Sequence, residues 1–243
     1  MPPATNRRSS RVRRLAVALS VVLLLAGCAH TVQGVARPAA AALKILPTEE
    51  EISAAAGNTL STFGFQPFAG GSEILPDGYR SDADAAPIGC VAVTDTAPHI
   101  VYEKLPVVEA ARQSYFNWDD GVDTSGADAA VVRLSTASAA ADAFDAFARQ
   151  WTQCAGTTVV KHVGGTVIDA EITDVAVHGQ LLSATVRTHQ LPRAPTSRYE
   201  RALGVRGNTV VEVSLAITAA GERKPDPRAA AVRVAESMLD KTQ

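Results

Sequence analysis

Three cysteines are the residues of this 243-residue sequence whose chemistry is easiest to define. A cysteine thiolate can be alkylated, form a disulfide, ligate a metal or act as a nucleophile. Cys28 ends a hydrophobic run near the N-terminus, whereas Cys90 and Cys154 lie far inside the chain. No Cys-x-x-Cys or His-x-x-His neighbours either internal cysteine, so the ligand spacing of a tetrahedral metal site is absent. The three thiols therefore have to be interpreted separately.

The N-terminal segment is typical of an export signal. Five arginines precede Leu15–Ala26, a run of 12 residues without charge. A transmembrane helix needs ~20 residues, and a basic start, a short apolar run and a small-residue end are typical of a signal peptide. Leu25-Ala26-Gly27-Cys28 resembles the lipobox of bacterial lipoproteins. The resemblance implies cleavage after Gly27, a diacylglyceryl group on Cys28, and attachment to the extracytoplasmic face of the cell membrane. A transmembrane anchor and an ordinary secretory signal are the alternatives.

The charge of the remaining chain excludes some partners. Removing residues 1–27 removes five of 23 basic residues and no acid, which leaves 18 basic against 25 acidic residues and a net charge of about −7. Nucleic-acid binding needs a basic footprint, so we expect no nucleic acid. Electrostatic adhesion to anionic lipid is disfavoured for the same reason. We therefore expect the membrane to be a partner through the diacylglyceryl anchor alone.

The two internal cysteines favour a disulfide. Export places Cys90 and Cys154 in an oxidising compartment, where paired thiols persist as disulfides. With Cys28 acylated, only one pairing is left. Such a bridge spans 64 residues of chain and stabilises the fold by ~4 kcal/mol in the loop-closure model. A metal site and a nucleophilic cysteine are the alternatives.

No motif of a known catalytic site stands out. Gly-x-Ser-x-Gly, His-Glu-x-x-His and the phosphate-binding loop of nucleotide-binding proteins are absent, and none of the five histidines has ligand spacing. Asp119 and Asp120 resemble a carboxylate pair, but adjacent acids after a strand usually lie in a solvated turn. The expectation is a protein that is not an enzyme, with no catalytic residues, no metal and no cofactor.

The elements that must position these residues begin after an alanine-rich stretch. Residues 28–46 are expected to be a lipidated cysteine and a flexible tether, and residues 47–243 a single domain. Thr48 and Glu51 form a capping-box pattern that predicts a helix over 49–56, which ends at Gly57. Residues 58–89 are rich in Gly, Pro and Asp and predict a long irregular segment.

Strands and two further helices follow. An antiparallel pair is expected at about 110–118 and 128–134, and the region 157–217 is β-rich with a hairpin turn at 206–208. Helical spacing of Phe144, Phe147 and Trp151 predicts the strongest helix, which ends near Gly156. A last helix is expected to begin with Asp226 as its N-cap and Pro227 at its first position. Residues 210, 212 and 214 alternate with residues 211, 213 and 215, as expected of a half-buried strand.

The order of these elements predicts an α+β single domain. Sequential strands joined by hairpins favour a twisted antiparallel sheet, and the amphipathic helices need an apolar surface to cover. The simplest assembly packs the helices on one side of the sheet.

Several of these segments together resemble a known family. They are Gly89-Cys90, the strand Tyr115–Trp118, the helix end Trp151-Thr152-Gln153-Cys154, and "RALGVRGNTVVEVSL" followed by a C-terminal helix. The chain resembles the PknH-like extracellular sensor domain of mycobacterial serine/threonine kinases and related lipoproteins. The resemblance implies a sheet flanked by helices with a cleft, a Cys90–Cys154 bridge, and an unidentified extracytoplasmic ligand. A second bridge that the family often carries has neither of its cysteines here.

Two functions are expected from these observations. The first is a lipid-anchored, non-catalytic sensor that holds a small or lipid-like ligand in a cleft lined by residues such as Tyr115, Trp118 and Arg133. The second is a structural or protein-interaction lipoprotein of the cell envelope, with a filled core and no pocket. An enclosed cavity would distinguish the first from the second.

Overall fold

The computed structural model of the protein describes residues 40–191, 197–223 and 229–242. The predicted signal peptide, Cys28, and the predicted cap at Asp226 and Pro227 lie outside these residues. Among the described helices, none is long and apolar enough to cross a membrane.

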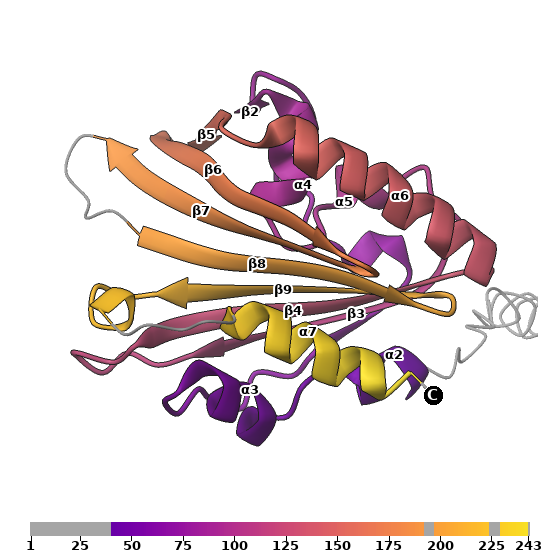
Figure 1. The fold of residues 1–243 in the computed structure, drawn as a ribbon, viewed down its shortest axis with the longest axis horizontal. Coiled ribbons are helices and arrows are strands. Elements are labelled where there is room, and N and C mark those ends of the chain that lie inside the picture. The colour runs from indigo at the N-terminus through magenta and orange to yellow at the C-terminus, as the bar shows by residue number, and fades with distance from the viewer. Residues whose placement is uncertain (1–39, 192–196, 224–228, 243) are drawn as a thin grey trace, which may run out of the picture. The chain divides into compact units, whose positions relative to one another are not determined.

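One antiparallel sheet of nine strands forms the centre of the described domain, in the order β1-β3-β4-β9-β8-β7-β6-β5-β2 (Figure 1). The strands are β1 Phe68–Gly70, β2 Ala85–Ala86, β3 Val107–Phe116, β4 Thr124–Leu134, β5 Thr158–Val163, β6 Thr166–His178, β7 Leu181–Leu191, β8 Ser197–Arg206 and β9 Thr209–Ile217. The predicted β-rich region is therefore confirmed, and the predicted antiparallel pair is β3 and β4. Both strands of that pair are longer than expected.

The central pairing of the sheet joins segments that are distant in sequence. Strands β5 to β9 form a meander in which each strand pairs with the next. The last of them, β9, returns to pair with β4, with Val211 opposite Val131. This pairing joins the β3–β4 hairpin to the meander and places β9 in the middle of the sheet.

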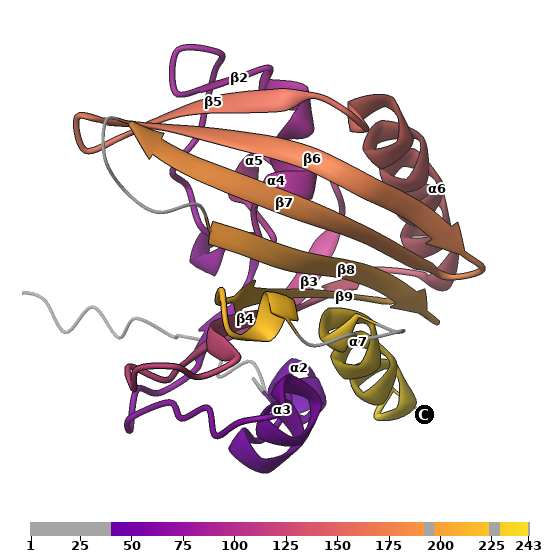
Figure 2. The same ribbon diagram turned by 60° about the vertical axis from the view of Figure 1, so that its left-hand side comes forward.

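Helices cover both faces of the sheet (Figure 2). Their bounds are α2 Ala40–Ile45, α3 Glu49–Ala56, α4 Val91–Thr94, α5 His99–Tyr102, α6 Ala137–Cys154 and α7 Ala230–Asp240. The helices α4, α5 and α6 pack on one face with Val210 of β9, whereas α2, α3 and α7 pack on the other with Val211. The expectation that the helices lie on one side is wrong, because central strands such as β9 are buried on both faces and each face needs a cover.

The local signals for the ends of α3 and the start of α6 are confirmed, whereas α7 begins at Ala230, later than expected. The Thr48 side chain accepts a hydrogen bond from the Glu51 N–H, and the Glu51 carboxylate accepts one from the Thr48 N–H. Gly57 ends α3 with φ +78°, a left-handed conformation that glycine adopts without a Cβ penalty. Thr136 caps α6, whose buried face carries Phe144, Phe147 and Trp151.

The predicted tether extends too far toward the C-terminus. Residues 40–45 form α2, in which Ala42 and Ile45 are buried in the core beneath the sheet. The Ala42 N–H also donates to Glu109 of β3 at 3.0 Å. The packed domain therefore already includes residue 40, because these small and apolar side chains cover the end of the β3–β4 hairpin.

Candidate functional site

The three residues expected to line a cleft do not come together. Tyr115 is buried in the core with α2 and α3, and its hydroxyl donates to the Pro47 carbonyl. Burial raises its pKa. Arg133 also lies on this face. Ala127 of β4 is opposite Tyr115, and Arg133 lies six residues further along β4. The Arg133 guanidinium pairs with the Glu109 carboxylate at 2.7 Å. The Tyr115 hydroxyl and the Arg133 guanidinium therefore have separate partners and line no common cavity.

Trp118 lies apart from the other two residues. It follows β3 in the turn before β4, and 69% of it is exposed. Its ring stacks on Phe63 with centroids 4.2 Å apart. Trp118 is therefore part of the outer surface of the sheet edge.

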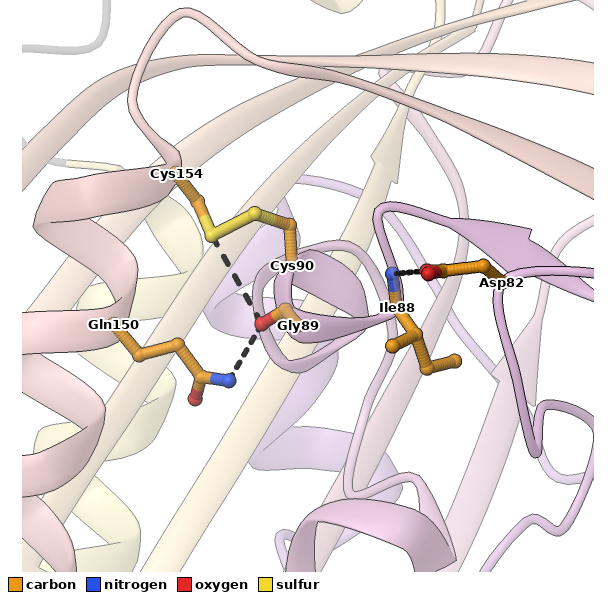
Figure 3. The surroundings of a disulfide bond; sticks show 6 residues. All are labelled: Asp82, Ile88, Gly89, Cys90, Gln150 and Cys154. Carbon is orange, nitrogen blue, oxygen red and sulfur yellow. Dashed lines mark hydrogen bonds between the residues drawn. A yellow bond between two sulfur atoms is a disulfide. The ribbon is translucent and has the colours of Figure 1, made fainter.

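The disulfide between Cys90 and Cys154 is present, with Cα atoms 5.6 Å apart. Figure 3 shows how it joins the end of α6 to the segment that precedes α4. The Gly89 carbonyl accepts a hydrogen bond from the Gln150 side chain of α6, and the Ile88 N–H donates to Asp82 at 2.7 Å. These bonds hold the segment from Asp82 to α4 against α6, so the position of α4 over the sheet is fixed from its N-terminal side.

An apolar groove lies beside the disulfide, between α6 and the segment that contains α5. Its volume is about 600 Å³. It is lined by Ile88, Gly89, Ile100, Val101, Leu105, Ala143, Ala146, Phe147, Arg149, Gln150 and Gln153. The charged and amide side chains come from α6, and the other side chains are apolar or absent. The groove therefore offers contact area but few polar groups that converge on one point.

A polar cleft lies on the same face of the sheet, where two cavities meet at Asp95. The first, of about 190 Å³, is lined by Pro76, Asp95, Thr96, Arg112, Gln113, Ser114, Asp128, Ala129 and Ala130. The second, of about 350 Å³, is lined by Pro76, Gly78, Tyr79, Asp95, Pro98, His162, Val163 and Gly164. Pro76 and Asp95 belong to both linings. We call this two-part cavity the Asp95 cleft.

The Asp95 carboxylate is held in place by a buried cation. It accepts hydrogen bonds from Lys161 Nζ at 2.6 Å and from the Thr94 hydroxyl at 2.7 Å. Burial lowers the pKa of Lys161, and the Asp95 charge opposes this effect. Burial and the Asp95 charge both raise the pKa of Tyr79. The Asp95 side chain nevertheless remains 27% exposed, so its carboxylate can still be reached from the cleft.

A second buried ion pair holds the backbone of the same segment. Arg201 of β8 is fully buried and pairs with Glu212 of β9 at 2.8 Å. Its guanidinium also donates to the carbonyls of Val93 at 2.9 Å and Asp95 at 2.6 Å. Two further hydrogen bonds, to the Thr96 hydroxyl and the Val213 carbonyl, complete the five that a guanidinium can donate.

Glu212 is bound from the opposite side by the next part of the chain. Its carboxylate accepts hydrogen bonds from the Tyr102 hydroxyl of α5 and from the Ala97 N–H at 3.0 Å. Together, Arg201 and Glu212 therefore fix residues 93–102 from below, and Lys161 fixes the Asp95 side chain. This arrangement makes the Asp95 cleft a preformed polar site.

The lining of the Asp95 cleft is polar. It offers two carboxylates, one guanidinium, one amide, hydroxyl groups and one imidazole. No group of three or more His, Cys, Asp or Glu side chains suited to a metal ion occurs among the described residues. An activated nucleophile needs an adjacent base that is itself oriented by a third group, and the interactions of Asp95 involve a cation and a hydroxyl.

Sequence reasoning missed the four charged residues that build the cleft. The alternation typical of a half-buried strand leaves one face of β9 open to solvent, but Glu212 is buried, because residues 91–102 cover its face. Lys161 and Arg201 also lie at inward positions of apolar strands. Charges of opposite sign at inward strand positions were the sequence signal that could have identified these residues. Buried charges are almost always paired, so such residues are candidates for one ion-pair network.

A family model and one solved structure agree with this fold. The family model of the PknH-like extracellular domain matches residues 37–241. The crystal structure of the extracellular domain of PknH from Mycobacterium tuberculosis superposes with a TM-score of 0.68 at 19% identity, covering 83% of this chain and 94% of that one. A Mycobacterium smegmatis protein of unassigned function aligns over 72% of this chain and 83% of that chain, at 10% identity and a TM-score of 0.37. No curated protein matches the sequence.

Proposed function

The chain belongs to the PknH-like extracellular domain family, and from this premise we propose that it is a lipid-anchored, non-catalytic sensor whose small ligand binds in the Asp95 cleft. The family assignment makes it an extracytoplasmic domain. Ligand binding, the ligand class and the lipid anchor are the parts that we propose.

The position of Asp95 is the observation that carries the proposal. Asp95 lines both cavities, and Lys161 binds its side chain while Arg201 binds its backbone carbonyl. A ligand site typically combines a cavity with a few convergent polar groups and titratable residues of shifted pKa. The lowered pKa of Lys161 and the raised pKa of Tyr79 fit this description.

The lining of the cleft favours a small polar ligand over a lipid-like one. Asp95 and Asp128 offer acceptors for hydroxyl or amine donors, and Thr96 and Ser114 offer hydroxyl groups. The cavities of about 190 and 350 Å³ lie at or below the lower end of the usual range for ligand pockets. A compound with several hydroxyl or amino groups and few atoms would match these groups.

The proposed anchor rests on Cys28. Cleavage after Gly27 leaves Cys28 twelve residues before Ala40, the first described residue of the domain. A diacylglyceryl group supplies two acyl chains, which is what stable attachment requires. The ligand site would then face the extracytoplasmic space close to the membrane.

Native mass spectrometry of the full chain, purified in detergent from the cells that naturally make it, tests ligand binding. We expect the native mass to exceed the denatured mass by one small non-covalent ligand. The Asp95→Asn variant should lose this extra mass, and Tyr79→Phe should reduce its occupancy. Asp142→Asn, on the exposed side of α6, is the matched control and should keep it.

The alternative is a structural or interaction protein of the envelope with no ligand. A native mass that equals the denatured mass in the wild-type protein would contradict the sensor and favour this alternative. An extra mass that survives Asp95→Asn and Tyr79→Phe would move the ligand away from the Asp95 cleft. The apolar groove beside α6 would then be the next cavity to test.

A further inference from the structure

A strip of four aromatic rings lies on the surface outside the lining of the Asp95 cleft. Phe65 contacts Phe116 edge to face with centroids 6.4 Å apart, and Phe116 stacks near Trp118 at 5.9 Å. Trp118 in turn stacks on Phe63 at 4.2 Å with only 11° between the ring planes. Phe63, Phe65 and Trp118 are more than half exposed. We call these four residues the aromatic strip.

The strip is held on a rigid support. Ser61 and Phe116 exchange two backbone hydrogen bonds, of 3.0 and 2.8 Å. A few residues further on, β1 pairs with β3, with Phe68 opposite Arg112. The segment 61–70 is therefore fixed at both ends along β3, so the backbone that carries Phe63 and Phe65 is already ordered before a partner binds.

The backbone at Phe63 is held in a conformation that a bulky residue rarely adopts. The Phe65 N–H donates to the Thr62 carbonyl at 2.9 Å, and the two residues between them have φ +50° at Phe63 and +81° at Gly64. Positive φ at both central positions favours Asn, Asp or Gly, and a bulky side chain there is an outlier. The Phe63 ring is nevertheless 51% exposed, so core packing does not account for it. Strain of this kind is concentrated at functional sites.

Carboxylates surround the strip. Asp119 and Asp120 follow Trp118 directly and are exposed. Glu49, at the start of α3, accepts hydrogen bonds from the backbone N–H and the hydroxyl of Thr62, both at 2.6 Å. These bonds lower the pKa of Glu49 and keep it ionised. The surroundings of the strip are therefore acidic.

A cation on one ring next to the strip shows the kind of contact that this surface makes. The Arg112 guanidinium lies 4.1 Å from the centroid of Phe68. Arginine and lysine are attracted to the faces of aromatic rings, most strongly to tryptophan. Exposed aromatic rings beside carboxylates thus offer a cation two favourable contacts at once, whereas phosphate groups would meet like charge.

From this charge complementarity we propose that the aromatic strip, with Glu49, Asp119 and Asp120 around it, is a docking surface for a basic segment of another polypeptide. An arginine of the partner stacks on Trp118 and pairs with the neighbouring carboxylates. Aromatic residues and arginine dominate the energy of protein interfaces, and complementary charge gives specificity and salt dependence. The surface shares no residue with the lining of the Asp95 cleft, so separate substitutions test each of them.

Fluorescence anisotropy of a labelled hexa-arginine peptide with the full chain in neutral detergent tests the proposal. We expect saturable binding that weakens with salt. Trp118→Ala should weaken it by about tenfold, and Asp119→Asn/Asp120→Asn should both weaken it and reduce its salt dependence. The double variant Asp142→Asn/Asp145→Asn, on the exposed side of α6, removes the same charge elsewhere and should leave the affinity within about twofold.

Several results would overturn the proposal. Equal losses in the two double-charge variants would mean non-specific attraction to an acidic protein. Unchanged binding by both Trp118→Ala and Phe63→Ala would remove the role of the rings. If phosphatidylcholine vesicles or the neutral glucan laminarin change the Trp118 emission while the peptide does not, the surface binds lipid or glycan. A dimer that Trp118→Ala dissociates would identify a second copy of the chain as the occupant.

Discussion

Replacing Glu212 by glutamine removes one charge from the ion pair beneath the Asp95 cleft and leaves the other buried. Arg201 and Glu212 are 2.8 Å apart and essentially inaccessible to solvent. Glutamine has nearly the same shape, but its single oxygen can replace only one of the two carboxylate oxygens, which accept from the Tyr102 hydroxyl and from the Ala97 N–H. The perturbation therefore removes the charge together with one acceptor, and Arg201 keeps only neutral partners.

The expected cost is large for a single isosteric change. Removing one partner of a buried pair destabilises a protein by about 3–5 kcal/mol. With a urea m-value of about 3 kcal/mol/M, the unfolding midpoint falls by about 1–2 M. Arg206 and Asp240 form the matched control, because they are 2.9 Å apart but 41% and 68% exposed. Asp240→Asn should cost at most about 1 kcal/mol.

Urea unfolding of the full chain with its disulfide intact, followed by circular dichroism, gives both midpoints. The double variant Arg201→Met/Glu212→Leu should recover part of the loss, because neither charge then remains unpaired. Equal midpoint shifts for Glu212→Gln and Asp240→Asn would refute the reasoning. That result would mean that water reaches the Arg201 guanidinium, so the pair does not hold residues 93–102 in place.

Three further predictions concern the cysteines and the tyrosines. Cys28→Ser should release the protein from the membrane fraction or leave it unprocessed, and a cleaved variant that still fractionates with membranes would exclude the lipid anchor. Cys90→Ala/Cys154→Ala should lower the free energy of unfolding by ~4 kcal/mol in a urea titration, because the bridge closes a long loop, and a loss below ~1 kcal/mol would contradict this. Burial raises the pKa of all four tyrosines above the unfolded value of ~10. The folded state then binds more protons above that pH, so stability is full below pH ~10 and falls as the pH rises through it. Phenolate absorbance should appear together with unfolding, and ionisation of the folded protein near pH 10 would contradict the burial.

Local signals in the sequence predicted the parts of the structure that depend on neighbouring residues. The capping box of Thr48 and Glu51 acts across three residues, and the stripe of Phe144, Phe147 and Trp151 repeats within one helix. Helix ends and amphipathic faces follow from these short-range contacts. The pairing of Cys90 with Cys154 was also accessible, since two internal thiols in an oxidising compartment allow one bridge.

The candidate ligand site was not accessible in this way. Tyr115, Trp118 and Arg133 share one hairpin in sequence, but distance along the strands separates Arg133 from Tyr115, and Trp118 lies beyond the end of β3. Asp95 and Lys161 meet although they are 66 positions apart in the sequence. The site combines the loop after α4 with residues of β5, β8 and β9. Residues this far apart in the chain form no spacing pattern that can be recognised in a single sequence.

The amino-acid sequence by itself predicts an export signal with a lipobox pattern, and it determined the α+β class, the ends of α3 and the single bridge that its internal cysteines allow. Only the tertiary structure decided that β9 lies beside β4, that helices cover both faces, and that Glu212 is buried with Arg201. The physical reason is that alternation records which residues share a face of a strand, whereas burial depends on what covers that face. For β9 the cover on one side is residues 91–102, more than a hundred residues earlier in the chain.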